Sequence, residues 1–416
     1  MINYCIFEDD TVTNLFPITE TRPLYDCLLG MSTIFEKFYQ QFKNNNITLH
    51  TRSYLKPILQ ESYKEFNINN INTGSPCLFF NGRVIITESL TSKIKKIDPE
   101  QNTLFTYKEN VVVAYLKGEL LDIAIHLLKD LPNNLTIIKQ IRSKCVVVEL
   151  DECNIITNCW DFIFYNKLYL ETDFKNSEKL GIIKGHISPF TAIYNESNVF
   201  INKNAYIEDF VIINAKNGPV YIEKNVKIHA HTRLEGPLFI GENTTIFGGR
   251  ISHSTIGESC KIAGEITNSI IESFSNKAHS GFLGHSYVGR WVNLGAETTT
   301  SNLKNDYSNI SIIVNNKKIP TNRQFLGTIF GDHVKTAIGT QLNSGSIINL
   351  GSIIFNHNFS TKYYPPFSWG NGTKKSYYQL EKFFESMKRV MQRRNIELSE
   401  NYKQLYSLLH KNYTKR

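Results

Sequence analysis

The chain has 416 residues, 41% hydrophobic and 20% charged, a balance typical of a globular protein with two or three domains. It has no run of about eighteen apolar residues and begins with acidic residues where a signal peptide is basic, so we expect a cytoplasmic protein without membrane contact. Its seven cysteines form no C-x-x-C pair, which argues against a disulfide framework or a structural zinc site.

The net charge of +8 is concentrated near the C-terminus. Residues 374–416 contain eleven Lys/Arg and four Asp/Glu, a net charge of +7, which leaves +1 for the rest of the chain. Nucleic-acid-binding proteins carry basic residues along a groove or face, so we expect no nucleic-acid partner. We interpret the basic tail as the solvated face of a helical segment, or alternatively as a contact for a phosphate-bearing ligand.

Residues 1–175 alternate strand-like and helical patterns. The predicted strands include 2–7, 111–115 and 145–150, and the predicted helices are 31–42 and 120–131, the second ended by Pro132. This alternation favours an α/β domain with a largely parallel sheet. Residues 79–86 are also compatible with a plain Asn-Gly hairpin between two short strands.

Between residues 182 and 356, a large apolar residue, mostly a branched aliphatic, recurs every six residues. The series includes Ile222, Ile228, Leu234, Ile240, Ile246, Ile256, Ile262, Phe282, Val288, Leu294, Leu342, Ile348 and Ile354. A period of six matches neither a strand nor a helix and is typical of hexapeptide repeats that build a triangular β-helix. Gly and Asn, both abundant here, tolerate the left-handed backbone of its corners.

The six-residue rhythm stops between residues 300 and 325. Within this excursion, residues 310–319 predict a hairpin about Asn315-Asn316, because Asn accepts the positive φ angles of a tight turn. An excursion of this length from a rigid prism is more often functional than accidental. Residues 376–412 carry helical spacing, so residues 365–416 are expected to form a basic helical cap whose helix pair closes the end of the β-helix.

A prism filled by aliphatic side chains has no interior pocket, so we expect ligand sites between the subunits of a homotrimer. One segment, residues 275–296, carries two histidines, two asparagines and several glycines next to the excursion. A neutral imidazole can take a proton from an amine, and backbone N–H groups at Gly295-Ala296 can stabilise an oxyanion. A surface histidine hydrogen-bonded at a corner is the alternative interpretation.

Several motifs extend over nearly the whole chain, namely residues 15–23, 81–83, 275–296, 302–307, 331–333 and 366–370. They resemble the bifunctional N-acetylglucosamine-1-phosphate uridyltransferase/glucosamine-1-phosphate N-acetyltransferases, and more closely a divergent branch of that family from Bacteroidetes-type bacteria. The resemblance implies a nucleotidyltransferase-like α/β domain over residues 1–175. It also implies a left-handed parallel β-helix acyltransferase domain over residues 182–356 and a helical cap over residues 365–416.

The resemblance also implies roles for individual residues of the β-helix. His279 would be the general base that deprotonates the amino group of the sugar phosphate. Asn293 and Asn302 would line the sugar and acetyl site, and Ala296 would contact acetyl-coenzyme A through its backbone. Arg250 lies one residue away from a phosphate-binding arginine of the family.

Four positions depart from the family pattern. Phe282 replaces a phosphate-contacting tyrosine and Thr267 replaces a lysine, and both changes weaken a phosphate site. Glu297 replaces a small residue and Ser280 replaces an aspartate. Acetyl transfer remains the expected reaction, while the acceptor sugar stays open.

In the N-terminal domain, Glu8-Asp9-Asp10 stands where the family has a glycine-rich phosphate loop. Acidic residues repel phosphates, so Asp9 and Asp10 would serve by holding Mg²⁺. Arg83 stands where the family has a magnesium-binding aspartate. The expectation is that Arg22 and Arg83 hold phosphate oxygens instead.

The sequence therefore predicts an acetyl-coenzyme A-dependent N-acetyltransferase acting on a glucosamine-1-phosphate-like amino-sugar phosphate. Coupling to nucleotidyl transfer from UTP, as in synthesis of UDP-N-acetylglucosamine, is part of this prediction. Two other functions remain open: a sugar-nucleotide-binding protein without turnover, and a solenoid metal hydratase that uses His279 and His285.

Overall fold

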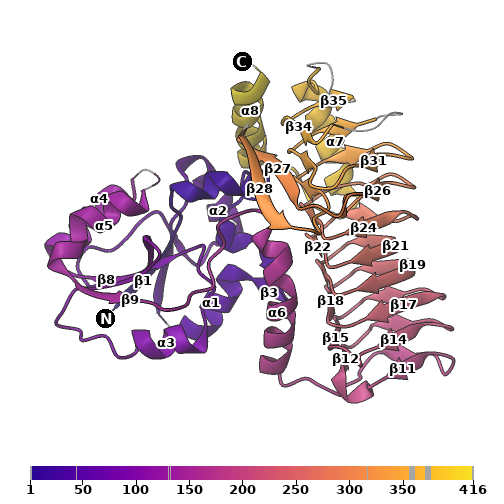
Figure 1. The fold of residues 1–416 in the computed structure, drawn as a ribbon, viewed down its shortest axis with the longest axis horizontal. Helices are drawn as coiled ribbons and strands as arrows, with labels where there is room; N and C mark the ends of the chain where they lie inside the picture. The colour runs from indigo at the N-terminus through magenta and orange to yellow at the C-terminus, as the bar shows by residue number, and fades with distance from the viewer. Residues whose placement is uncertain are drawn as a thin grey trace. The chain divides into compact units, whose positions relative to one another are not determined.

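A computed structural model describes residues 2–43, 45–129, 131, 133–315, 317–355, 361–370 and 376–414 (Figure 1). The chain divides into two compact units. The α/β unit comprises Met1–Leu15, Thr21–Cys27 and Thr33–Thr157, and the β-helix unit comprises Phe16–Glu20, Leu28–Ser32 and Asn158–Arg416. Within the described ranges, no helix has both the length and the apolar character needed to cross a membrane.

The α/β unit is built on a seven-stranded sheet. In spatial order its strands are β5 (Asn67–Ile68), β4 (Asn46–Leu49), β1 (Asn3–Phe7), β6 (Cys77–Asn81), β8 (Asn110–Leu116), β7 (Thr103–Tyr107) and β9 (Val146–Glu149). Neighbouring strands are parallel except that β8 runs antiparallel to β6 and β7. The helices are α1 (Ile34–Phe42), α2 (Lys56–Ser62), α3 (Glu88–Ile94), α4 (Glu119–Leu127) and α5 (Asn134–Ile141). The expected α/β domain with a largely parallel sheet is confirmed.

Local chemistry shifts some predicted boundaries in this part of the chain. The helix expected from residue 31 begins at Ile34, because the short strands β2 (Leu28–Leu29) and β3 (Ser32–Thr33) precede it and Thr33 caps it through the backbone N–H of Glu36. The helix end expected at Pro132 lies outside the described residues, and α4 ends at Leu127. The hairpin interpretation of residues 79–86 is wrong, because β6 pairs with β1 and β8 while Val84 pairs with Ile155.

The β-helix unit contains the expected left-handed parallel β-helix, whose strands lie on three faces. Face I comprises β12 (Val199–Ile201), β15 (Val220–Ile222), β18 (Leu238–Ile240), β20 (Thr255–Ile256), β22 (Ile270–Ile271), β25 (Tyr287–Val288), β29 (Ile329–Phe330), β32 (Ile347–Ile348) and β34 (Tyr363–Tyr364). Face II comprises β10 (His186–Ile187), β13 (Tyr206–Ile207), β16 (Lys227–Ile228), the first parts of β19 (Thr245–Ser252) and β21 (Lys261–Thr267), β23 (Asn276–Lys277), β30 (Lys335–Thr336), β33 (Ile353–Ile354) and β35 (Trp369–Gly370). Face III comprises β11 (Ala192–Tyr194), β14 (Ile212–Asn214), β17 (Thr232–Glu235), the second parts of β19 and β21, β24 (Phe282–Gly284), β26 (Thr299–Thr300) and β31 (Gln341–Leu342).

The interior of the prism is filled by one apolar cluster that contains nearly every member of the six-residue series. Phe282 is the exception, and its predicted inward position is wrong. Strand β24 pairs Leu283 with the inward-facing Ile266 and pairs Phe282 with Glu265, so Leu283 is buried and Phe282 faces outward. The count of six back from Val288 reaches Phe282, but the interior residues Leu283 and Val288 are only five positions apart in the sequence.

The corner between faces I and II is a ladder of residues with positive φ. In the early coils it consists of Asn204, Asn225 and Asn243, whose side-chain amides hydrogen-bond in series at 3.3 and 3.0 Å. In the later coils it becomes aromatic, and the Trp291 and His333 rings lie 6.2 Å apart. Bulky residues with positive φ are uncommon, so the surrounding structure must hold these aromatic corners in place.

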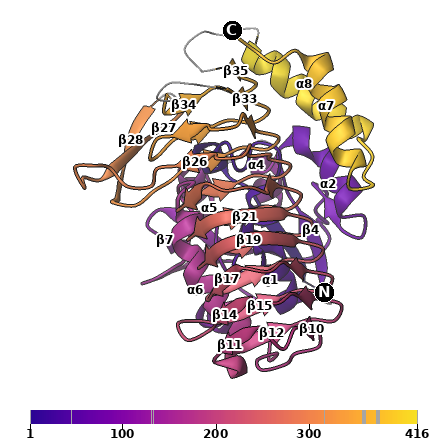
Figure 2. The ribbon, with the colours of Figure 1, turned by 90° about the vertical axis from the view of Figure 1, so that its right-hand side faces the viewer.

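Helices α7 (Leu380–Gln392) and α8 (Glu400–Thr414) cover the aromatic part of this corner (Figure 2). The ring of Phe383 meets His333 edge-on at 5.8 Å, and Tyr406 meets it at 5.4 Å. Basic residues such as Lys388 are exposed on the opposite side of α7. The expected C-terminal helices are confirmed, and they pack along a corner of the prism, while a cap that closes its end stays a prediction. The exposed basic residues fit the interpretation of the basic tail as a solvated helix face.

Other segments cover parts of face I. Helix α6 (Asp161–Asn176) packs Phe174 against the outward-facing Tyr221. Strands β27 (Ile310–Val314) and β28 (Lys317–Arg323) form the hairpin predicted in the excursion, although Asn316 at its turn lies outside the described residues. Ile310 is buried against Gly345, so the hairpin folds back on its own β-helix.

Shortening Met387 to alanine should destabilise the cap, because its side chain is fully buried in α7. Large-to-small core substitutions cost about 2–5 kcal/mol, so the midpoint of urea unfolding should fall clearly. The matched control is Lys388→Ala, one residue away and exposed, which should leave the midpoint nearly unchanged. Equal midpoints for both variants would show that α7 does not stabilise the fold.

Candidate functional site

Face III carries outward side chains that are accessible along several coils. Strand pairing places Arg250 beside Glu265 and Glu265 beside Phe282, with adjacent rungs about 4.8 Å apart. Corner residues flank this face on both edges. His279 precedes β24 on one edge, and His285 follows β24 on the other.

A groove of about 770 Å³ lies along the upper coils of this face. Its volume falls within the roughly 300–1,000 Å³ typical of small-molecule sites. The residues that line it include Glu297, Thr299, Lys304, Asp306, Gln341 and Lys362. The groove therefore contains both carboxylate and ammonium groups, and it includes Glu297 at the corner that follows Ala296.

The His279 side chain is exposed, while its backbone is held from inside the prism. Lys277 Nζ donates hydrogen bonds to the carbonyl oxygens of His279 at 2.7 Å and Ser280 at 3.0 Å. Burial lowers the pKa of Lys277 to about 8. Lys277 pairs with Ile262 in the inward column, so a lysine takes the place of an aliphatic side chain to hold this corner.

Sequence reasoning missed Lys277, although a signal was present. It follows Ile271 by six residues, so the hexapeptide series itself assigns it an inward position. A lysine at such a position has to find acceptors within the prism, because a buried ammonium group without partners is costly. The two carbonyl oxygens at the His279 corner meet this need.

The corner of the next coil, at Glu297, is hydrogen-bonded to the corner that carries His279 and Ser280. Ser280 Oγ donates a hydrogen bond to Glu297, and the Glu297 N–H donates to the Ser280 carbonyl oxygen at 3.2 Å. Ala296 accepts from the N–H of Gly339 at 2.8 Å. The Gly295 N–H donates to Thr336 Oγ1 at 3.0 Å. This amide, one of the two expected oxyanion donors, is therefore engaged within the β-helix.

The opposite edge of face III is formed by a histidine and an asparagine. Asn302 Nδ2 donates to His285 Nδ1 at 2.9 Å, and Phe325 stacks on the His285 ring at 5.3 Å. Burial lowers the pKa of His285 to about 4. The ring is therefore neutral near pH 7 and fixes the orientation of Asn302.

Two predicted residues lie away from the His279 corner. Arg250 donates to Glu235 through Nε at 3.0 Å and Nη2 at 2.8 Å, and it lies two rungs from Phe282 along face III. Asn293 lies on face II, where it pairs with Asn276 and Lys335. The structure thus brings His279, Ala296 and Asn302 to the edges of one face and leaves Asn293 on its neighbour.

In the α/β unit, ligands are expected at the carboxyl ends of the strands where the strand order reverses. That point lies between β1 and β6, which are followed by Asp9 and Arg83. Arg83 Nη2 forms an ion pair with Asp9 Oδ2 at 2.7 Å, and both side chains are 0% exposed. Asn81 Nδ2 also donates to Asp9 at 2.8 Å. The two groups expected to bind metal and phosphate neutralise each other.

A second buried ion pair lies beside the first. Arg52 Nη2 forms an ion pair with Glu8 Oε1 at 3.2 Å, and Thr51 Oγ1 donates to Glu8 Oε2 at 2.8 Å. Arg22 is buried, and its carbonyl oxygen accepts from Arg52 at 2.8 Å. The end of β1 is thus occupied by contacts within the chain.

These residues do not fit a magnesium ion. Asp9 already accepts from two nitrogen-bearing side chains and from Thr11, and Asp10 Oδ2 accepts from Asn133 Nδ2 at 2.8 Å. Hard divalent cations need several free oxygen ligands. Across the described ranges, no group of three or more His, Cys, Asp and Glu residues is placed to hold a metal ion.

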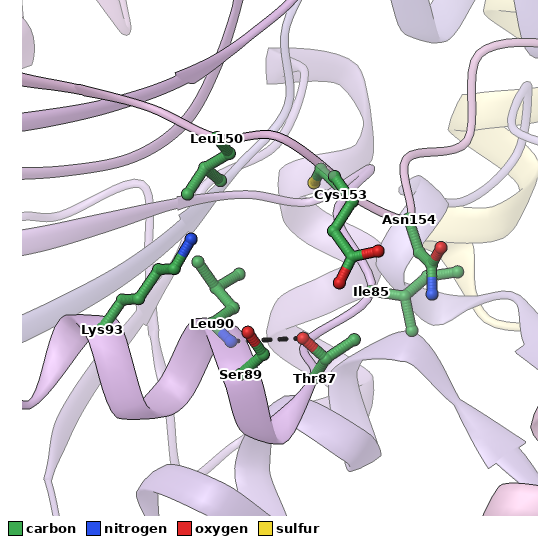
Figure 3. A pocket seen from close by; sticks show the side chains of 9 residues that line it. Ile85, Thr87, Ser89, Leu90, Lys93, Leu150, Cys153 and Asn154 are labelled. Atoms are coloured by element: carbon green, nitrogen blue, oxygen red, sulfur yellow. Dashed lines mark hydrogen bonds between the residues drawn. The ribbon is translucent and has the colours of Figure 1, made fainter.

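A small pocket of about 110 Å³ lies between α3 and residues 150–154 (Figure 3). It is smaller than the roughly 300–1,000 Å³ typical of small-molecule sites. Lys93, Leu150 and Cys153 are among its lining residues. Burial raises the pKa of Cys153 to about 11, so this thiol is protonated near pH 7 and is a poor nucleophile.

Comparisons with known proteins match the N-terminal part of the chain to a family and parts of the chain to named relatives. Residues 4–180 match the family model described as sugar nucleotidyl transferase. Two archaeal relatives are a Bifunctional protein GlmU from Methanococcus vannielii and a Bifunctional sugar-1-phosphate nucleotidylyltransferase/acetyltransferase from Sulfurisphaera tokodaii. The Methanococcus protein is 30% identical over a segment that covers 51% of this chain and 45% of its own length. The Sulfurisphaera protein is 32% identical over a segment that covers 35% of this chain and 37% of its own length. The chain is similar to bifunctional sugar nucleotidyltransferase/acetyltransferases.

The matched segments span less than half of these relatives' lengths. Among solved structures, a UDP-N-acetylglucosamine acyltransferase matches 46% of this chain and 70% of its own at 17% identity and a TM-score of 0.15. The Arabidopsis UDP-N-acetylglucosamine acyltransferase matches 55% and 90% at 13% identity and a TM-score of 0.20.

Replacing Arg83 with methionine should destabilise the α/β unit strongly, because Asp9 would remain buried without its partner. Breaking one side of a buried ion pair costs about 3–5 kcal/mol. The double variant Asp9→Asn/Arg83→Met should lose less than the sum of the two single variants in free energy of unfolding. Lys144→Met, which removes an exposed ion pair with Glu119, should cost under about 1 kcal/mol. Additive losses would show that the buried pair is not coupled.

Proposed function

We propose that the protein is an acetyl-coenzyme A-dependent N-acetyltransferase that acts on an amino-sugar phosphate such as glucosamine-1-phosphate. One observation carries this proposal: His279 is exposed at the edge of face III, and its backbone is anchored by Lys277. The β-helix of residues 182–356 would carry this activity. In this proposal Asn293, Asn302 and Arg250 bind the sugar phosphate.

In this reaction the substrate amine attacks the thioester carbonyl carbon of acetyl-coenzyme A. His279 accepts the proton that the amine loses, the carbon–sulfur bond breaks, and coenzyme A leaves as a thiolate. Lys277 and the link between Ser280 and Glu297 hold the corner, so the imidazole starts from a fixed backbone. The Ala296 backbone is the proposed contact for acetyl-coenzyme A.

The groove along face III supports binding of the acyl donor. Lys304 and Lys362 lie on its wall, and the pKa of Lys362 is lowered first by burial and then by Lys304 and Lys318. A cluster of cations of this kind is suited to the phosphates of coenzyme A. Lys304 Nζ donates to Ser308 Oγ at 2.7 Å, and Ser308 Oγ donates to Asp306 Oδ1 at 2.8 Å, which orients Lys304.

We further propose that the active form is a homotrimer. The prism interior is filled by apolar side chains, so a site on face III is open on one side unless a neighbouring copy covers it. The hairpin of β27 and β28 packs on its own coil, so it would contribute only its exposed strand β28 to such a contact.

The Asp9–Arg83 ion pair argues against catalysis by the α/β half. We propose that residues 1–175 bind a sugar phosphate or sugar nucleotide without releasing pyrophosphate. Nucleotidyl transfer from UTP with Mg²⁺ would require Asp9 and Arg83 to separate and to take up metal and phosphate. The cost of breaking a buried pair argues against that step.

Replacing His279 with alanine should lower the turnover of glucosamine-1-phosphate acetylation by about 10²–10⁴-fold, because a general base typically contributes that much. Acetyl-coenzyme A affinity and the oligomer seen by sedimentation should be retained. His231→Ala is the control, because His231 is an exposed residue at the same corner of the prism in an earlier coil. Near-normal turnover of the His279 variant would remove His279 from the mechanism.

The wild-type protein should release no pyrophosphate from UTP and N-acetylglucosamine-1-phosphate in the presence of Mg²⁺. The same preparation should still transfer acetyl groups, which shows that it is folded. Pyrophosphate release that is abolished by Asp9→Asn would contradict the non-catalytic assignment of the α/β half. Such a result would restore Asp9 as a metal ligand.

A further inference from the structure

A column of polar side chains runs along the outer side of face II. Lys261 pairs with Asn276 in parallel strands, Asn276 pairs with Asn293, and Asn293 pairs with Lys335. Side chains at matching positions of parallel strands point the same way, about 4.8 Å apart. These four residues therefore form consecutive rungs of one ladder.

Hydrogen bonds fix the orientation of the two side-chain amides in this ladder. Arg394 Nη2 donates to Asn276 Oδ1 at 2.9 Å, and Asn276 Nδ2 donates to Asn293 Oδ1 at 3.3 Å. A guanidinium group can only donate, so it fixes the orientation of the first amide and thereby of the second. Asn293 consequently turns its Nδ2 donor away from Asn276.

The next rung presents a second donor. Lys335 Nζ is shielded from solvent and has no hydrogen-bond partner, although part of its side chain is accessible. Burial lowers the pKa of Lys335 to about 8. An ammonium group in this state lacks the acceptor that buried charges ordinarily have. The side chain of the neighbouring Asn293 is exposed, so this rung pair reaches solvent on the Asn293 side.

Further positive charge lies at the Lys261 end of the ladder. The pKa of Lys261 is lowered first by burial and then by Arg394 and Arg393. These cations repel one another, and the field at that end of the ladder favours an anion. At the other end, the two donors on adjacent rungs, Asn293 Nδ2 and Lys335 Nζ, are complementary to a group with several acceptor oxygens.

We propose that Asn293 and Lys335 form a binding site for a phosphoryl group on the outer side of face II. One phosphate oxygen accepts from Lys335 Nζ and another from Asn293 Nδ2. Arg394 sets the amide direction. This inference rests on the proposed function, which assigns Asn293 to the sugar phosphate, and it is tested by phosphate binding so that a failure of acetyl transfer alone does not decide it. The phosphoryl group belongs to free phosphate or to a sugar phosphate.

The test compares phosphate binding by the full-length wild type, Lys335→Met and Lys227→Met, by calorimetry at constant ionic strength. Lys227 lies in the same outward column at an early coil and is exposed, so it is the matched control. Loss of a charge-assisted contact should raise the phosphate Kd about tenfold or more in Lys335→Met and leave it unchanged in Lys227→Met. Equal affinities in all three proteins would overturn the proposal.

A second variant keeps the proposal testable if Lys335→Met fails to fold. Asn293→Asp supplies a carboxylate beside Lys335 within the protein, so it should raise the thermal midpoint in phosphate-free buffer and abolish phosphate binding. Unchanged phosphate binding in Asn293→Asp would also overturn the site. Titration with glucosamine-1-phosphate distinguishes the sources: competition with phosphate identifies a sugar phosphate, and binding of phosphate alone identifies the free ion.

Discussion

Side chains at the inward positions of the β-helix pack directly on those of the next coil, and the other features of this unit depend on that column. Parallel pairing repeats each position at every rung, so an aliphatic residue inside one coil requires another above it. The filled interior leaves no space for a ligand. Chemistry is therefore confined to corners and outward faces, where side chains from successive coils stand in line.

Two lysines depart from the ordinary pattern of the prism, with different consequences. Lys277 points into the column, where the carbonyl oxygens of His279 and Ser280 satisfy it. Lys335 points outward and meets no acceptor. Lys277 stabilises the corner that carries the candidate base His279. Lys335 is an ammonium group without an acceptor, which is the basis for the proposed anion site. Burial lowers both pKa values to about 8, so geometry rather than acidity separates their roles.

The two halves of the chain differ in whether their charged and polar side chains are buried in ion pairs or exposed. At the ends of β1 and β6, Asp9 and Glu8 are neutralised by Arg83 and Arg52 within the fold. On faces II and III of the β-helix, the side chains of Asn293 and His279 are exposed. A scaffold similar to sugar nucleotidyltransferases can thus carry buried ion pairs at the strand ends where ligands are expected.

The amino-acid sequence by itself determined the β-helix, the α/β alternation and the C-terminal helices, because hydrophobic periodicity is a local property that each segment carries. Resemblance pointed to His279 and Asn302, which lie on opposite edges of one face. Only the tertiary structure decided that Leu283 and not Phe282 faces inward, since this depends on the register of a neighbouring coil. It alone decided that Asp9 pairs with Arg83, because these residues are 74 positions apart and meet only when β1 and β6 lie side by side.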